Sequence, residues 1–302
     1  MAEAVGRPKD PPEGGPDKKF FLMTHTSRPL ILAALILVVA AVAAFAQSIW
    51  FQGEGYRDFG TRIARPESFD GTFHFCRLQY RSAWREAGGS GWSTDYPGAD
   101  INFSIRFSEL TKTRVRMDPR TQEPDHLVVP IGSDLLFQCP WVSLEDSGTA
   151  FFSPVEAEAL RKYLLKGGFL WADDYWGSRA WERWADQIAK VLPPDVYPIV
   201  DIPIAHAMFH TLFDVKRVPQ VPSIQSWRRF RGSATSERGA DSAEVHVRGI
   251  FDQHERLMVL MTHNTDISDT WEREGEDSDY FYRFSPEGYA IAIDVMLYAM
   301  TH

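Results

Sequence analysis

The sequence predicts an α/β domain with a mainly parallel sheet, preceded by one apolar N-terminal segment. Three features of the 302-residue chain predict this arrangement. An apolar strand at Phe169–Ala172 is followed by a tight turn and a helical pattern, which is the order of a βα unit. A capped helix precedes that strand, so helices are expected on the faces of a parallel sheet. Near the N-terminus, Leu30–Ala46 is almost purely aliphatic.

The composition is that of a globular protein, with 44% hydrophobic and 24% charged residues. These values exclude a mainly disordered, collagen-like or multi-span membrane chain. The net charge is -9, and no block of the chain is rich in Lys and Arg, so nucleic acid is not expected as a partner. Cys76 and Cys139 could pair outside the cytoplasm. A cysteine in a buried strand is usually a small apolar residue, however, so we expect two unactivated free thiols.

Residues 29–50 determine the expected location of the protein. No charged residue occurs from position 29 to 53, a run long enough to cross a ~30 Å hydrocarbon core. Lys18, Lys19 and Arg28 precede this run, which is the arrangement that keeps the N-terminus inside. Two interpretations remain open: an uncleaved transmembrane anchor in the cell membrane, or the h-region of a signal sequence cleaved after Ala46. Both place the remainder of the chain outside the cytoplasm, in the periplasm if the segment is cleaved.

The organisation that follows has four parts. Residues 1–28 have the composition of a disordered head, residues 29–50 are the anchor or signal segment, residues 51–70 are a linker, and residues 71–302 form the α/β domain. We find no internal repeat, P-loop, GxGxxG or GxSxG motif.

Apolar periodicity predicts the first elements of this domain. Phe73–Tyr80 has the pattern of a strand. A turn-rich stretch at 88–99 then leads to a helix that Asp100 would cap, with three apolar residues spaced at i, i+4 and i+7. Val128–Phe137 and Trp141–Leu144 are candidate strands.

The best-defined predicted helix spans Ser153–Lys166. An S-x-x-E capping box with proline at the first helical position opens it, and a Gly-Gly pair ends it. A second helix starts near Ser178, directly after the Phe169–Ala172 strand and its turn. Two further strands are predicted at Val245–Phe251 and Arg256–His263, followed by a last helix from Ser285 to about Met300.

Four segments of the chain carry a family resemblance: residues 73–103, residues 153–177, the region of His206, and residues 256–272. Over residues 70–302 the chain resembles the uncharacterised bacterial family labelled domain of unknown function 4159. The resemblance implies a class I glutamine amidotransferase-like fold, which is a flavodoxin-like α/β sandwich, and it implies no activity.

In true amidotransferases, a cysteine nucleophile lies on the sharp turn after a buried strand and is activated by a His–Glu pair. The corresponding turn in this chain holds Asp173 and Asp174. Neither cysteine has the Gly-x-Cys-x-Gly context of that turn. Glutamine hydrolysis by a cysteine is therefore not expected.

Asp173 and Asp174 are the strongest candidate site residues. A parallel sheet binds ligands at the carboxyl ends of its strands, and both residues follow such a strand. They could act as metal ligands, as a general base, or as a polar anchor for a ligand. The alternative is structural, with Asp as a helix cap or turn former. The neighbouring Trp176 favours a pocket wall.

A second polar group ends the Arg256–His263 strand and consists of His263, Asn264 and Asp266. If this strand is parallel to Phe169–Ala172, both polar groups border one cleft. An antiparallel placement would send His263 to the opposite edge of the sheet. The alternative to a functional role is an Asx-turn in a solvated loop.

Two weaker candidate groups complete the set. His206 and His210 are four residues apart, so a helix would place both on one face at metal-ligand spacing, although no Glu lies between them as in HExxH. A structural role, or a catalytic role for one histidine, is the alternative. Trp92, Asp95 and Tyr96 lie in a Gly-rich loop that could bind a sugar or act as a lid, or could simply pack.

The sequence supports two functions of different classes. One is a membrane-anchored or exported ligand-binding or assembly module that lacks the amidotransferase nucleophile. The other is a hydrolase on a cell-envelope or carbohydrate substrate, using Asp173 or Asp174 with His206 or His263, with or without a metal ion. The expected partners are the membrane, through residues 29–50, and other envelope proteins. No motif identifies a cofactor.

The location can be tested directly. We expect residues 54–302 to lie outside the cytoplasm, because the charge-free run can cross the membrane and the basic residues precede it. A reporter that is active only in the cytoplasm should be silent when fused after His302 and active when fused after Arg28. Strong activity of the His302 fusion would contradict the prediction.

Overall fold

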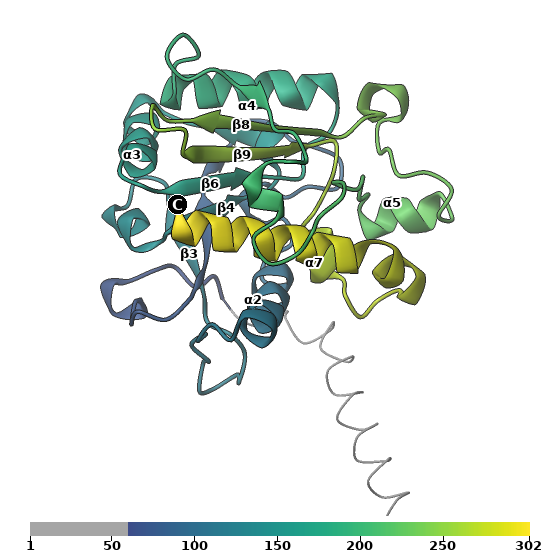
Figure 1. Ribbon diagram of the computed structural model, residues 1–302, viewed down its shortest axis with the longest axis horizontal. Coiled ribbons are helices and arrows are strands. Elements are labelled where there is room, and N and C mark those ends of the chain that lie inside the picture. Colours follow the sequence, from purple (N-terminus) through teal and green to yellow (C-terminus); the bar gives the residue numbers. More distant parts are fainter. Residues whose placement is uncertain (1–59) are drawn as a thin grey trace, which may run out of the picture. The chain divides into compact units, whose positions relative to one another are not determined.

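The fold is built on a seven-stranded sheet with the strand order β3-β1-β4-β6-β9-β8-β7. The computed structural model describes residues 60–302 (Figure 1). The predicted head, the anchor or signal segment and residues 51–59 of the predicted linker lie outside these residues. Strands β3, β1, β4, β6 and β9 are parallel, whereas β8 is antiparallel to β9 and β7 is antiparallel to β8. The predicted α/β class with a mainly parallel sheet is therefore confirmed.

The strands are β1 (Phe75–Gln79), β2 (Arg81–Ser82), β3 (His126–Pro130), β4 (Trp141–Leu144), β5 (Ala150–Phe151), β6 (Phe169–Ala172), β7 (Val200–Asp201), β8 (His246–Phe251) and β9 (Leu257–His263). The helices are α2 (Gly98–Thr111), α3 (Pro154–Leu165), α4 (Gly177–Val191), α5 (Ile224–Arg229), α6 (Asp269–Glu272) and α7 (Ser278–Thr301). Strands β2 and β5 form a separate antiparallel pair. At the outer edge of β3, Ile63 forms a parallel bridge with Val128.

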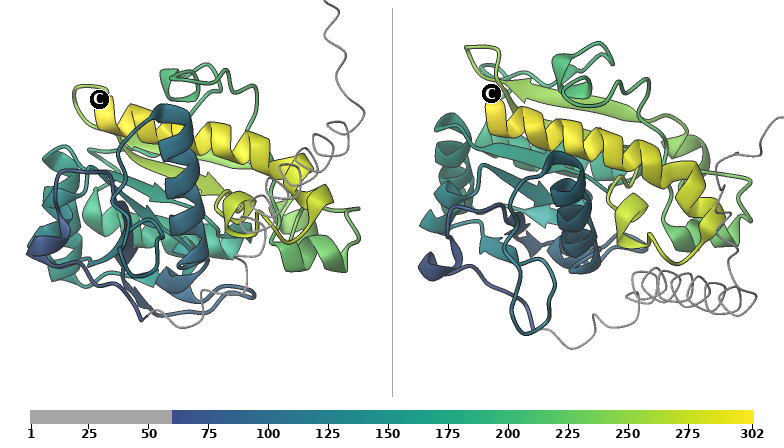
Figure 2. Two further views of the ribbon diagram at one scale, coloured as in Figure 1. Left: turned by 90° about the horizontal axis from the view of Figure 1, so that it is seen from below. Right: turned by 60° about the horizontal axis from the view of Figure 1, so that its bottom comes forward.

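Helices cover both faces of the sheet, and each face has its own hydrophobic core (Figures 1 and 2). Helices α3 and α4 pack on one face, and α2 and α7 pack on the other. The strands serve both cores because successive side chains point to opposite faces. In β6, for example, Leu170 and Ala172 enter the first core, and Phe169 and Trp171 enter the second.

Local sequence signals located several elements correctly. The capping box of α3 is present, since Ser153 Oγ accepts from Glu156 N and Glu156 Oε2 accepts from Ser153 N at 2.8 Å. Strands β4 and β6 match the predicted ranges, and β8, β9 and α4 start within one residue of their predicted positions. Strand β9 is parallel to β6, so the antiparallel alternative for residues 256–263 is excluded.

Two predicted helix starts were wrong. Asp100 does not cap α2, which begins at Gly98; its carboxylate is fully buried and paired with Arg77 instead. The last helix begins at Ser278, seven residues before the predicted Ser285, and contains Pro286 in its interior. This proline removes one hydrogen bond to the carbonyl four residues earlier, and that residue is exposed, so water can satisfy the carbonyl.

Within residues 60–302, no helix is both long enough and apolar enough to cross a membrane.

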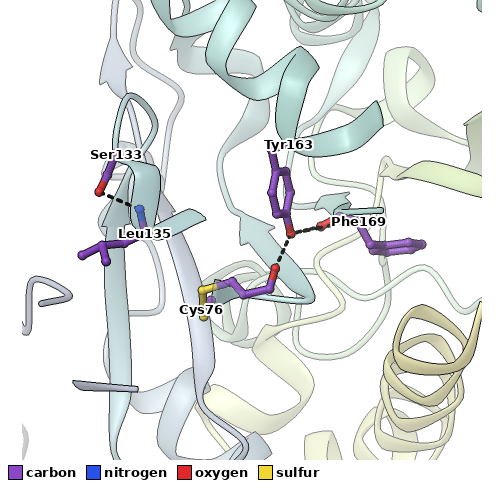
Figure 3. Close-up of a disulfide and its surroundings, with 6 residues drawn as sticks. Cys76, Ser133, Leu135, Tyr163 and Phe169 are labelled. Atoms are coloured by element: carbon purple, nitrogen blue, oxygen red, sulfur yellow. Dashed lines mark hydrogen bonds between the residues drawn. A yellow bond between two sulfur atoms is a disulfide. The ribbon is translucent and has the colours of Figure 1, made fainter. Parts of the chain in front are cut away.

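The two cysteines form a disulfide, contrary to the expectation of free thiols (Figure 3). Cys76 lies in β1, and Cys139 follows the 3-10 turn that leads to β4; their Cα atoms are 6.2 Å apart. The Tyr163 hydroxyl of α3 donates to the carbonyl of Cys139 at 3.0 Å. The pairing could not be predicted from local sequence, because the two cysteines are 63 residues apart in the chain.

The disulfide predicts a clear chemical behaviour. An alkylating reagent should label neither cysteine in the unfolded, unreduced protein, and should label both after reduction. The Cys76→Ala variant should lose about 2–5 kcal/mol of unfolding free energy in urea titrations, because a long closed loop no longer restricts the unfolded chain. Labelling of both cysteines without reductant would show that they are not paired.

Candidate functional site

Three acidic turns meet at one edge of the sheet. Asp146 follows β4, Asp174 follows β6 and Asp266 follows β9, and these strands are parallel neighbours. Their carboxyl ends therefore open at the same edge. All three aspartates line one cavity of about 250 Å³, which we call the acidic pocket. Asp174 and Asp266 therefore border one cavity, as expected, whereas Asp173, His263 and Asn264 do not line it.

Acidic side chains dominate the acidic pocket. Loops before α2, before α4 and around α5 complete the wall that the three turns begin. The pocket is lined by eight carboxylates and two guanidinium groups, which belong to Glu86, Asp95, Asp146, Asp174, Glu237, Asp266, Asp269, Glu272, Arg238 and Arg273. Both arginines pair with a glutamate next to them in the chain. Acidic groups therefore outnumber basic groups in the lining of the pocket by eight to two.

The backbone is in the left-handed region at three of these aspartates. The φ angle is +62° at Asp95, +50° at Asp146 and +50° at Asp174. Few residues other than glycine adopt this conformation, and Asp tolerates it better than most. The turn at Asp174 redirects the chain from β6 into α4. At Asp146, the buried Tyr80 hydroxyl lies 2.7 Å from the Glu145 carbonyl and 2.9 Å from the Asp146 carbonyl, which fixes the turn.

The Gly-rich loop is tied to the site by its backbone. The Gly91 amide donates to Asp146 Oδ2 at 2.8 Å, and the Ser90 amide donates to Thr94 Oγ1 at 2.8 Å. A Cβ at Gly89 would lie 2.3 Å from Asp146 Oδ2, so only glycine permits this approach. The loop is therefore anchored to the turn after β4.

A buried arginine holds the segment that carries Asp95. Arg77, in the middle of β1, binds Asp100 through its Nε at 3.0 Å, and both side chains are fully buried. Its Nη1 also donates to the carbonyl of Thr94 at 2.7 Å. The residue next to Asp95 is thus fixed by a charge-assisted hydrogen bond.

One hydroxyl links three of the carboxyl groups. Ser268 Oγ lies 2.5 Å from Asp95 Oδ2, 3.1 Å from Asp266 Oδ1 and 3.2 Å from Glu145 Oε2. A serine hydroxyl has one proton to donate. Three ionised carboxylates cannot all be satisfied by it, so this cluster needs additional protons or a cation.

The electrostatic environment supports the same conclusion. Burial raises the pKa of Asp174, Asp266 and Asp269 well above the usual range, and repulsion from neighbouring carboxylates raises each further. Below the pocket, burial raises the pKa of Glu145 to about 8 and that of Asp173 to about 7. The ligand-free pocket therefore retains protons near neutral pH.

Three of the carboxylates are close enough to share one metal ion. Oxygen atoms of Asp95, Asp269 and Glu272 all lie within 4.8 Å of one another. Asp269 and Glu272 are the first and last residues of α6, so their spacing places them on one helix face. Asn102 Nδ2 donates to the Trp271 carbonyl at 2.7 Å, which joins α6 to α2 beside Asp95. An all-oxygen set suits hard cations such as Ca²⁺, Mg²⁺ or Mn²⁺.

Five of the candidate residues from the sequence line the acidic pocket: Asp95, Tyr96, Asp174, Trp176 and Asp266. The Trp176 indole donates to Asp174 Oδ1 at 3.0 Å. Residues that were selected from separate segments for their polar or aromatic side chains therefore line the same cavity.

Other candidates support the pocket from behind. Asp173 Oδ1 accepts from Thr262 Oγ1 at 2.5 Å, and its Oδ2 accepts from the Ile267 amide at 2.8 Å, so Asp173 ties β6 to the turn after β9. Asn264 Oδ1 accepts from the Gly177 amide at 2.8 Å, at the start of α4. The Trp92 ring packs against Tyr96, with centroids 5.7 Å apart.

The histidines lie elsewhere. His263 stacks on Tyr175, with ring centroids 5.0 Å apart, and its Nε2 is 3.0 Å from the Gly177 carbonyl. Burial lowers the pKa of His263 to about 4. His206 packs on Phe251, at the opposite edge of the sheet. No helix joins His206 to His210, because residues 207–209 form a 3-10 turn, so the imidazoles do not share a helix face.

Sequence reasoning missed several lining residues. Asp146 could have been found, because it follows the predicted Trp141–Leu144 strand just as Asp174 follows β6. Glu86 and Glu237 come from irregular loops and carry no local signal. Only the folded loops bring them to this edge of the sheet.

Comparison with known proteins gives one finding. The model of a family described as a domain of unknown function (DUF4159) matches residues 74–300. No curated protein matches the chain. The matched region contains every strand of the sheet and every residue of the acidic pocket.

The buried acids predict how stability depends on pH. Burial raises the pKa of Asp146 and of Glu86 to about 7 in the folded chain, from about 4 when exposed. Between these values the folded state binds more protons than the unfolded state. The unfolding free energy should therefore fall as pH rises from about 5 to 7, by about 1.4 kcal/mol per pH unit and per group.

Urea titrations across this pH range measure the effect. The Glu86→Gln variant should show a flatter dependence than the wild type, whereas Glu158→Gln, on the exposed side of α3, should not change it. An unfolding free energy that rises between pH 5 and 7 would contradict the prediction.

Proposed function

We propose that this chain, which belongs to the family described as a domain of unknown function (DUF4159), is a ligand-binding domain that holds a hard divalent cation in its acidic pocket. The cation would provide the positive charge through which the domain binds an anionic or carbonyl-bearing ligand. The membrane segment expected from the sequence would place this domain outside the cytoplasm.

One observation carries the proposal. Asp95, Asp269 and Glu272 offer three carboxylate oxygens within 4.8 Å of one another on the wall of the acidic pocket. A divalent cation at this point would interact favourably with all three and with Asp174 and Asp266 nearby. It would take the place of the protons that the crowded carboxyl groups otherwise retain.

The charge of the pocket supports a cationic occupant over an anionic one. Arg238 and Arg273 are the basic lining residues, and both are engaged by glutamates. Like charges in a partly enclosed site repel strongly, so an anion would enter only together with a cation. The cavity of about 250 Å³ has room for a metal ion, its waters and a small ligand group.

The disulfide supports the location outside the cytoplasm. Disulfides persist in oxidising compartments and are rare in reducing ones. The Cys76–Cys139 pair is therefore consistent with export or anchoring through residues 29–50. We also infer that the scaffold is an amidotransferase-like sandwich in which the acidic turn after β6 stands where those enzymes have their nucleophile.

The alternative function is a hydrolase on an envelope or carbohydrate substrate. The position of Asp174 supports this alternative. Asp174 has a left-handed backbone conformation on the strand-to-helix turn, and it lines the pocket together with Asp266. Two observations favour binding over this alternative. Neither His206 nor His263 lines the pocket, so a general base would have to be a carboxyl group. The acidic turn after β6 also supplies no cysteine or serine.

Cation titration of the full-length protein tests the proposal. We expect isothermal titration calorimetry to show saturable binding of Ca²⁺, Mg²⁺ or Mn²⁺, with an increase in melting temperature at saturating cation. The Asp269→Asn variant should weaken binding at least about 10-fold, because it removes one charged ligand.

A matched control keeps this test specific. Glu158→Gln removes one carboxylate from the surface of α3 and should leave the affinity unchanged. Binding that is equally tight in both variants would place the cation elsewhere. Absence of saturable binding of all three ions would overturn the proposed function.

A further inference from the structure

A small chamber lies beneath the acidic pocket, between the sheet and the helices of its second core. Its apolar wall comes from β1, β4, β6, α2, α6 and α7, and includes three tryptophans, Trp141, Trp171 and Trp271. Its polar side is formed by Ser143, Glu145, Asp173 and Ser268. The space measures about 10 Å³, which is about the least that can hold one water molecule.

Two hydrogen-bond donors at this chamber have no protein acceptor. The side chains of Trp141 and Trp271 are each at least nine-tenths buried. Neither indole N–H group has a hydrogen-bond acceptor among residues 60–302. The third indole, on Trp171, donates to Thr262 Oγ1 at 2.8 Å. A buried polar group without a partner destabilises the folded state, so two such groups beside one cavity point to a bound molecule.

We propose that this chamber binds one ordered water molecule. The water accepts hydrogen bonds from the Trp141 and Trp271 indoles and donates to the carboxyl groups of Glu145 and Asp173. Two acceptor and two donor positions match the capacity of water, and buried waters typically make two to four such bonds. A larger ligand does not fit, and a bare cation would face two N–H donors.

The chamber water connects to the acidic pocket through Ser268. This hydroxyl lies 3.2 Å from Glu145 Oε2 on the chamber side and 2.5 Å from Asp95 Oδ2 on the pocket side. Asp173 is held in the same layer, because its Oδ2 accepts from the Ser268 amide at 3.2 Å. The water thus extends the hydrogen-bond network of the pocket floor into the core.

Nuclear magnetic resonance of the full chain, labelled with ¹⁵N at tryptophan, tests this inference. We expect cross-peaks between a long-lived water and the indole N–H protons of Trp141 and Trp271, assigned with Trp141→Phe and Trp271→Phe. The Ala292→Val variant adds volume from α7 into the chamber, because Ala292 lines it and is buried. Both cross-peaks should then disappear.

Ala290→Val is the matched control, since it makes the same change on α7 at a half-buried position that does not line the chamber. Both cross-peaks should persist in it. Absence of the cross-peaks in the wild type, or their persistence in Ala292→Val, overturns the inference. If Ala292→Val does not fold, a high-resolution crystal structure of the wild type decides, by showing or lacking one density peak within hydrogen-bonding distance of both indole nitrogens. The outcome is independent of whether the acidic pocket binds a cation.

Discussion

Parallel pairing of β4, β6 and β9 is the constraint on which the site depends. Parallel neighbours end at the same edge, so Asp146, Asp174 and Asp266 meet although about 120 residues separate the first from the last. Helices on both faces leave this edge as the open part of the sheet, where ligands bind in α/β folds. The antiparallel β8 lies outside this group and contributes no lining residue.

A concentration of carboxylates this high has to be stabilised from within the protein. Arg77 is fully buried behind the pocket, and its charge attracts Asp100, Glu145 and Asp95. A buried pair of this kind costs desolvation energy, and its benefit here is positional, because the same guanidinium orients the loop that carries Asp95. Protons on the crowded carboxyl groups supply the remaining compensation, and a cation would replace them.

The elements of the fold could largely be predicted from the sequence because their signals are local. A capping box, a Gly-Gly stop and an apolar strand identify α3 and β6 within a few residues of chain. The prediction failed where a distant partner changed the outcome. Asp100 has the identity of a helix cap but pairs with Arg77, 23 residues away, and Cys76 finds Cys139 across an intervening loop. Helix α7 continues through Pro286 because its packing outweighs one lost hydrogen bond.

For the candidate site, the sequence by itself determined the chemistry of the turns after β6 and β9: acidic and amide side chains follow apolar strands there, and no nucleophilic cysteine is present. It also determined the apolar run at residues 29–50. Only the tertiary structure decided which of these groups share a cavity. In the folded chain, Glu86, Asp146 and Glu237 line the pocket, whereas the candidates His206 and His263 do not. The physical reason is that pocket membership depends on strand direction and loop packing, which are properties of residues far apart in the chain.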